Sequence, residues 1–179
     1  MNIFLMAASL RKDSVNKKLT DLCQKILSAD HQIDYASMSE FDVPLYNMDI
    51  QNSSGIPATV NDFVKRITQA QKIIISSPEY NFSMSGVLKN LIDWVSRVQP
   101  MPWKGVEILL MSASPSMVGG NRGLWNTRIP LEACGSFVYP EMFSLADAYN
   151  AFDQDGSLAD KKLQSRLGQL LNDFINKGK

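Results

Sequence analysis

Histidine and cysteine are scarce in this chain of 179 residues, which has one histidine and two cysteines. A Ser-His-Asp triad would depend on His31 alone, in a polar turn after the first expected helix. Cys23 and Cys134 each fall within a helical pattern of apolar residues. A buried free thiol is the common case there, and a disulfide or catalytic thiol is the minority one. The scarcity excludes a His-rich metal site, and we expect no bound metal.

An excess of charge of one sign is also missing, because 18 lysine and arginine residues balance 18 aspartate and glutamate residues. A neutral chain has no general attraction for nucleic acid or anionic membranes, although the balance does not exclude a local basic pocket. Residues 1–8 lack basic side chains and are too short to span a bilayer, so they indicate a first strand and not a signal peptide. We therefore expect a cytoplasmic protein without nucleic-acid or membrane partners.

Two phosphate-binding motifs are absent as well. No Gly-x-Gly-x-x-Gly follows the first expected strand, which excludes a dinucleotide fingerprint, and no Gly-x-x-x-x-Gly-Lys-Ser/Thr is present, which excludes a P-loop nucleoside triphosphatase. A length of 179 residues suits one core that buries roughly two thirds of the unfolded surface. We expect a single domain over residues 1–179.

Short apolar runs alternate with helical patterns along the chain. Ile73, Ile74 and Ile75 form a run without alternation, as in a strand buried on both faces of a parallel sheet. Four similar segments predict further strands, at residues 3–8, 32–38, 106–112 and 137–145. Five strands alternating with five helices predict an α/β fold, a flavodoxin-like doubly wound parallel sheet in the order 2-1-3-4-5. That order brings together the loops after strands one, three and four.

The loop after the first strand has the chemistry of an anion site. Two lysines occupy the first turn of the helix that follows, where the helix dipole prefers negative charge. Ser9 and Ser14 offer hydroxyl groups, Arg11 offers a guanidinium and Asn16 an amide, and the free N–H groups of the helix start complete a site for a monophosphate. The alternative is that Ser14 is an ordinary N-cap and that Arg11 lies in a solvated turn.

The loops after the third and fourth strands suit a flat ligand. The first of them, residues 78–86, combines planar side chains with hydrogen-bonding ones, as a heteroaromatic ring requires. The alternative is that Pro78 only ends a strand and Ser85 only caps a helix. The second, residues 113–120, consists of small residues that would let a ligand approach the backbone, and a flexible connector is its alternative.

Four further features carry smaller expectations. Residues 39–54 contain Pro44 and no helical period, which indicates a surface or active-site loop. Trp94 lies on the less apolar side of its helix and suggests a subunit contact. Pro130 predicts a kink or break in the helix over 121–134. Residues 153–157 resemble the start of a calcium loop, but Gln164 stands where the bidentate glutamate belongs, so we expect a turn.

Three motifs stand at these loops: Pro78-Glu79-Tyr80-Asn81 followed by Ser83, Gly86, Leu88-Lys89-Asn90 and Asp93-Trp94; Ser9-Leu10-Arg11 with Ser14 and Asn16; and Gly119-Gly120 with Arg122 and Arg128. Through these motifs the whole chain resembles the NADPH-dependent FMN reductase family, a flavodoxin-like group that includes quinone, azo-dye and chromate reductases. The chain departs from the family at Ala8, where glycine is usual, and at Pro130, which interrupts the fourth helix.

The resemblance implies an FMN cofactor, with NADPH or NADH as co-substrate and a homodimer or homotetramer as the assembly. It implies a phosphate site at Ser9, Arg11, Ser14 and Asn16, and an isoalloxazine site along Pro78, Glu79, Tyr80, Asn81 and Ser83, closed by residues 112–120 with Ser114, Gly119 and Gly120. The hypothesis is a ping-pong transfer of hydride from NAD(P)H to the flavin and of electrons to an acceptor, with no catalytic side chain named.

Two other functions are compatible with this fold. A flavodoxin-like electron carrier would be strongly acidic and would have a Thr/Gly-rich phosphate loop, whereas this chain is neutral. A flavin-binding regulator without reductase activity stays open, since a fold does not fix a function. The pocket residues do not choose among quinone, flavin, azo compound and metal oxyanion as acceptor.

Overall fold

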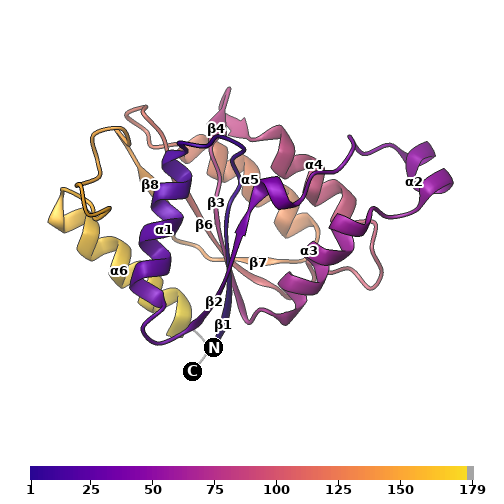
Figure 1. Ribbon diagram of the computed structural model, residues 1–179, viewed down its shortest axis with the longest axis horizontal. Helices are drawn as coiled ribbons and strands as arrows, with labels where there is room; N and C mark the ends of the chain where they lie inside the picture. Colours follow the sequence, from indigo (N-terminus) through magenta and orange to yellow (C-terminus); the bar gives the residue numbers. More distant parts are fainter. Residues whose placement is uncertain (177–179) are drawn as a thin grey trace.

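The computed structural model describes residues 1–176 of the chain, and its centre is a parallel sheet in the order β2-β1-β3-β6-β7 (Figure 1). The strands of this sheet are β1 (Asn2–Ala7), β2 (Gln32–Ser37), β3 (Lys72–Ser76), β6 (Glu107–Ala113), β7 (Phe137–Val138) and β8 (Phe143–Leu145). The predicted flavodoxin-like order is confirmed. The fifth strand differs from its prediction, because β7 and β8 both pair with β6 and are separated by a segment that contains Pro140. Proline has no N–H to give to a strand ladder.

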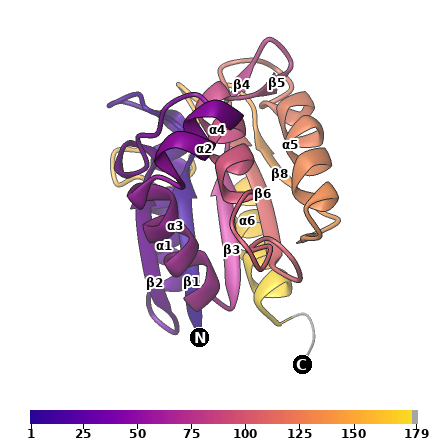
Figure 2. The same ribbon diagram turned by 90° about the vertical axis from the view of Figure 1, so that its right-hand side faces the viewer.

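Helices cover both faces of the sheet, as two views of the ribbon show (Figures 1 and 2). The helices are α1 (Val15–Leu27), α2 (Met48–Ser54), α3 (Ala58–Gln69), α4 (Gly86–Val95), α5 (Asn121–Ala133) and α6 (Lys161–Asn176). Ile73 and Ile75 pack against α3, α4 and α5, whereas Ile74 packs against α1 and α6. Alternate side chains of one apolar strand therefore enter two separate cores, as its lack of alternation predicts. Of the kink or break predicted at Pro130, the break does not occur, since α5 continues through Pro130 to Ala133.

The segment between β2 and α3 is not wholly irregular, in contrast to the prediction. It contains a short 3₁₀ helix, η1 (Met38–Glu40), and α2, which buries none of its residues and projects from the fold (Figure 1). The preceding chain covers Trp94, whose indole Nε1 donates to the carbonyl of Pro44 at 2.7 Å and whose ring meets Tyr46 edge-on. Trp94 is fully buried, so its predicted place in a subunit contact is wrong.

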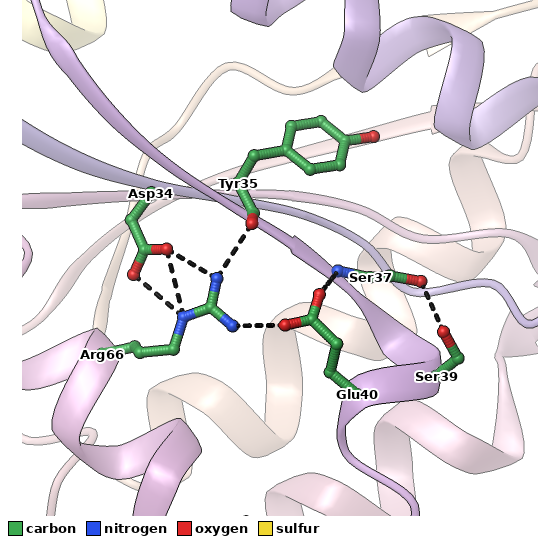
Figure 3. A network of polar contacts seen from close by, with 6 residues as sticks. All are labelled: Asp34, Tyr35, Ser37, Ser39, Glu40 and Arg66. Carbon is green, nitrogen blue, oxygen red and sulfur yellow. Dashed lines mark hydrogen bonds and ion pairs between the residues drawn. The ribbon is translucent and has the colours of Figure 1, made fainter.

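Arg66 of α3 fastens the outer strand β2 to the fold (Figure 3). Its guanidinium donates to both carboxylate oxygens of Asp34, to the carbonyl of Tyr35 at 2.9 Å and to Glu40 at 2.8 Å. Glu40 in turn accepts the backbone N–H of Ser37, which closes a capping box on η1. These hydrogen bonds raise the pKa of Arg66, so the network keeps its cation.

Within residues 1–176 there is no helix of the length and apolar character needed to cross a bilayer.

Residues 153–157 form a turn before α6. Asp153 of this turn pairs with Lys161, the first residue of α6, at 3.0 Å.

Candidate functional site

Three loops meet at the carboxyl ends of the parallel strands, because β1, β3 and β6 are neighbours that end at Ala7, Ser76 and Ala113. The side chain of Asn16, in the first turn of α1, ties the ends of β3 and β6 together. Its Nδ2 donates to the carbonyl of Ala113, and its Oδ1 accepts both the hydroxyl of Ser76 and the N–H of Ala113, each at 2.9 Å. Asn16 is buried, and its amide supports the loops from beneath.

The loop between β1 and α1 presents hydroxyl and cationic groups. Ser14 is the N-cap of α1 and its Oγ accepts the N–H of Lys17, while the Oγ of Ser9 accepts the N–H of Arg11. Arg11 is exposed and donates to the hydroxyl of Tyr149, a hydrogen bond that raises the pKa of Arg11. A cavity of about 210 Å³ adjoins this loop; its lining is Ala7, Ser9, Leu10, Arg11, Lys12, Lys17, Tyr35, Ala36, Ser37 and Ser39. Cations and hydroxyl groups around one cavity suit an anion.

The loop after β3 forms a small hairpin, β4 (Glu79–Tyr80) with β5 (Ser83–Met84), which rises above the strand ends (Figure 2). Its turn residues Asn81 and Phe82 have positive φ angles of 50° and 64°, the twist that two-residue hairpins favour. Pro78 is buried, Ser83 is half-buried and the ring of Tyr80 is half-exposed. The carboxylate of Glu79 is directed to α5, where it accepts the N–H of Gly123 at 2.7 Å.

A mainly apolar cavity of about 450 Å³ lies between the first loop and this hairpin. Its lining is Ala8, Ser9, Leu10, Arg11, Tyr80, Ser85, Gly86 and Val87. Ser85 joins the two sides, since its hydroxyl donates to the carbonyl of Ala8 at 3.0 Å. The volume is within the range of small-molecule sites. The predicted cap at Ser85 is confirmed, because its Oγ accepts the N–H of Leu88 at the start of α4.

The loop after β6 is fixed by backbone contacts. Ser114 donates its N–H to the carbonyl of Leu145, and its hydroxyl donates to Ser116. Gly119 and Gly120 are buried with φ angles of 62° and 84°. A Cβ on Gly119 would lie 2.8 Å from the backbone at Leu145, and one on Gly120 would lie 2.1 Å from the Oγ of Ser112. Only glycine fits these two positions, so the loop closes tightly over the end of the sheet.

Another cavity, of about 460 Å³, lies between α1 and residues 152–156 and shares no lining residue with these loops. Its walls carry Lys18 and Lys25 beside Asp21, Asp153 and Asp155, so charges of both signs face one another across it. The three loops are therefore the better candidate site.

Comparison with known proteins places this geometry in a family. The model of the NADPH-dependent FMN reductase family matches residues 1–150. The chain belongs to this family. It is therefore an oxidoreductase of a flavoprotein family that uses FMN and NAD(P)H. The donor set fits FMN, because the Ser9–Ser14 loop offers hydroxyl groups and a guanidinium to a phosphate and an apolar cavity adjoins it.

Two relatives and one solved structure extend the comparison. The chain is 34% identical to the quinone reductase of Escherichia coli (strain K12), over 100% of this chain and 97% of that protein. It is 33% identical to an NAD(P)H-dependent FMN reductase of Pseudomonas aeruginosa, over 93% and 89%. The flavoenzyme NAD(P)H:(acceptor) oxidoreductase FerB of Paracoccus denitrificans superposes with a TM-score of 0.81 at 28% identity, over 98% and 95%.

Eleven of the twelve predicted site residues lie in the three loops and Asn16 lies beneath them in the first turn of α1, but the side chains of two residues have a different orientation from the one expected. The side chains of Asn16 and Glu79 are used within the protein, the first beneath the loops and the second on α5. Sequence reasoning missed Tyr149, which reaches Arg11 from a loop 138 residues away. No local pattern marks such a contact.

Proposed function

We propose that this protein reduces a quinone, a flavin or a similar small acceptor with electrons from NAD(P)H, by a ping-pong reaction in the cytoplasm. When bound, FMN would supply the two-electron redox chemistry that connects the pyridine nucleotide with the acceptor. The observation that carries the proposal is the meeting of three loops of suitable chemistry in a chain 34% identical to a quinone reductase.

The phosphate belongs at the first loop in this proposal. Ser9 and Ser14 would donate hydroxyl hydrogen bonds to it, and Arg11 would supply a positive charge together with the first turn of α1. Asn16 would act from below, by holding the ends of β3 and β6 against that loop. The cations around the adjoining cavity would raise the affinity for a dianion further.

The ring belongs along the hairpin, at the mainly apolar cavity of about 450 Å³ that extends from Ser9 to Tyr80. Pro78, Tyr80, Asn81 and Ser83 would border one side, and the backbone of Ser114, Gly119 and Gly120 would close the other. Backbone N–H groups of such loops stabilise the negative charge that develops on a reduced ring. The half-exposed Tyr80 leaves room for a flat acceptor to stack.

A homodimer or homotetramer is part of the proposal. Trp125 and Ile129, four residues apart on α5, are 54% and 66% exposed, and Phe137 at the start of β7 is 68% exposed. Helix residues four apart lie on one face, and large exposed apolar side chains are typical of interfaces. Sedimentation should give a mass above that of one chain, and replacing Trp125 and Ile129 with lysine should lower it.

An anaerobic absorbance spectrum of the purified protein, reconstituted with FMN, tests the function. The oxidised flavin bands should bleach when NADPH or NADH is added, and a quinone should then restore them without further nucleotide. Bands that dithionite bleaches but neither nucleotide does would contradict the reductase and indicate an electron carrier. Failure to bind FMN at all would refute the proposed phosphate site.

A further inference from the structure

Helix α5 begins with a cap that comes from another part of the chain. Its own N-cap residue is Gly120, which has no side chain to accept a hydrogen bond. Glu79 supplies the missing acceptor from the hairpin, because its Oε2 accepts the N–H of Gly123, the third residue of the helix, at 2.7 Å. The carboxylate meets one of the free N–H groups of the first turn and places negative charge at the positive end of the helix dipole.

Glycine lets the hairpin approach α5 closely at this point. A Cβ on Gly123 would lie 3.0 Å from the Cβ of Glu79 and 3.1 Å from the carbonyl of Ser83. A Cβ on Gly120 would lie 3.5 Å from the Cβ of Glu79 and 2.1 Å from the Oγ of Ser112 in β6. The hairpin, the start of α5 and the end of β6 therefore meet with little space between them, and Glu79 lies at their junction.

The hairpin tip depends on this support. Phe82 has a positive φ of 64°, in a backbone region that residues other than glycine, asparagine and aspartate rarely adopt. Two further contacts come from α5: Asn126 donates its Nδ2 to the carbonyl of Phe82 at 2.8 Å, and the guanidinium of Arg122 lies 4.4 Å from the centre of the Phe82 ring. Together with the bond from Glu79, they hold the hairpin to one helix.

We propose that Glu79 is a positioning residue whose carboxylate holds the β4–β5 hairpin against the start of α5. It thereby sets the separation between residues 78–84 and 114–120, because Gly120 joins α5 to the second of these loops. The inference rests on the proposed function, in which the two loops border the flavin ring. Glu79 affects the position of that ring only indirectly, through Gly123 and the hairpin backbone. The length of its side chain matters more for this than its negative charge.

Three substitutions at Glu79 separate the effect of side-chain length from the effect of charge. Glu79→Gln keeps the length and an acceptor oxygen, Glu79→Asp keeps the charge but is one methylene shorter, and Glu79→Ala loses both. We expect the aspartate and alanine variants to bind FMN about tenfold more weakly and with a shifted flavin spectrum, and the glutamine variant to stay within about threefold of the parent. Glu132→Gln is the matched control, since it removes the same charge from the last turn of α5, where Glu132 pairs with Arg128 at 2.8 Å.

Amide hydrogen exchange of the flavin-free protein gives a second measurement that does not depend on FMN. Exchange in residues 79–84 and 121–124 should be about tenfold faster in the aspartate and alanine variants, and unchanged in the glutamine variant and the Glu132 control. The proposal would be overturned if the glutamine variant were as impaired as the alanine variant while the aspartate variant behaved like the parent. The charge of Glu79 would then matter more than the length of its side chain. Unchanged exchange and affinity in all variants would overturn it too. A parent protein that binds no FMN would refute the proposed function alone, and the exchange data would still decide the role of Glu79.

Discussion

Replacement of Asn16 by alanine is the sharpest test of how the loops are held. The change deletes three buried hydrogen bonds and leaves the hydroxyl of Ser76 and both backbone groups of Ala113 without that partner. Each unsatisfied buried group costs about 1–3 kcal/mol, and water entering the space of the lost amide recovers part of this. We expect a loss of about 3–5 kcal/mol in the free energy of unfolding, which corresponds to roughly 10 °C in Tm for a chain of this size.

Urea unfolding at neutral pH measures this loss, and two variants serve as comparisons. Ser76→Ala removes one of the three bonds and should cost about 1 kcal/mol. The double variant should cost about 1 kcal/mol less than the sum of the two single ones, because both changes delete the same bond. A loss below about 1 kcal/mol for Asn16→Ala would refute the reasoning, since the ends of β3 and β6 would then be held by something else.

Three other predictions concern stability. Gly120→Ala should destabilise the protein by more than about 2 kcal/mol in thermal unfolding, because its Cβ would overlap a serine hydroxyl. Gly156→Ala, with a similar φ but nothing within 4 Å, should cost only about 1 kcal/mol, and equal losses would contradict this. Trp94→Phe should cost about 1–2 kcal/mol in thermal unfolding, and a loss below about 0.5 kcal/mol would show that Trp94 is not enclosed. Burial raises the pKa of Tyr35 to about 12, so the folded state keeps a proton that the unfolded chain loses near pH 10. Stability should therefore fall as the pH rises from about 10 to 12, and Tyr35→Phe should flatten that fall in denaturant titrations; an unchanged slope would contradict the assignment.

The sheet could be predicted because burial leaves a local pattern. The run at Ile73–Ile75 has no polar face, which is typical of a strand buried on both faces of a sheet. Pro140, in contrast, divides the last predicted strand, and the rule that proline gives no hydrogen bond to a ladder could have found that division.

Contacts between segments that are distant in the chain could not be predicted from the sequence. Trp94 lies on the less apolar side of its helix, yet it is buried in the fold, where its indole donates to a carbonyl 50 residues earlier in the chain. The directions of Asn16 and Glu79 depend likewise on partners 97 and 44 residues away. The composition of the candidate site could be predicted, but the division between groups that face a ligand and groups that hold the loops could not.

The guanidinium of Arg66 has a consequence for the behaviour of the protein at high concentration. β2 is the outer strand of the sheet, and an outer strand presents backbone groups to which a strand from another molecule can pair. Arg66 donates a hydrogen bond to the carbonyl of Tyr35, so this carbonyl is no longer available to another strand. Together with Asp34 and Glu40 it also places charged groups at the edge of β2. A chain without Arg66 would therefore expose an outer strand edge that pairs more readily with other molecules. Its defect would appear as loss of colloidal stability, while its redox activity stayed intact.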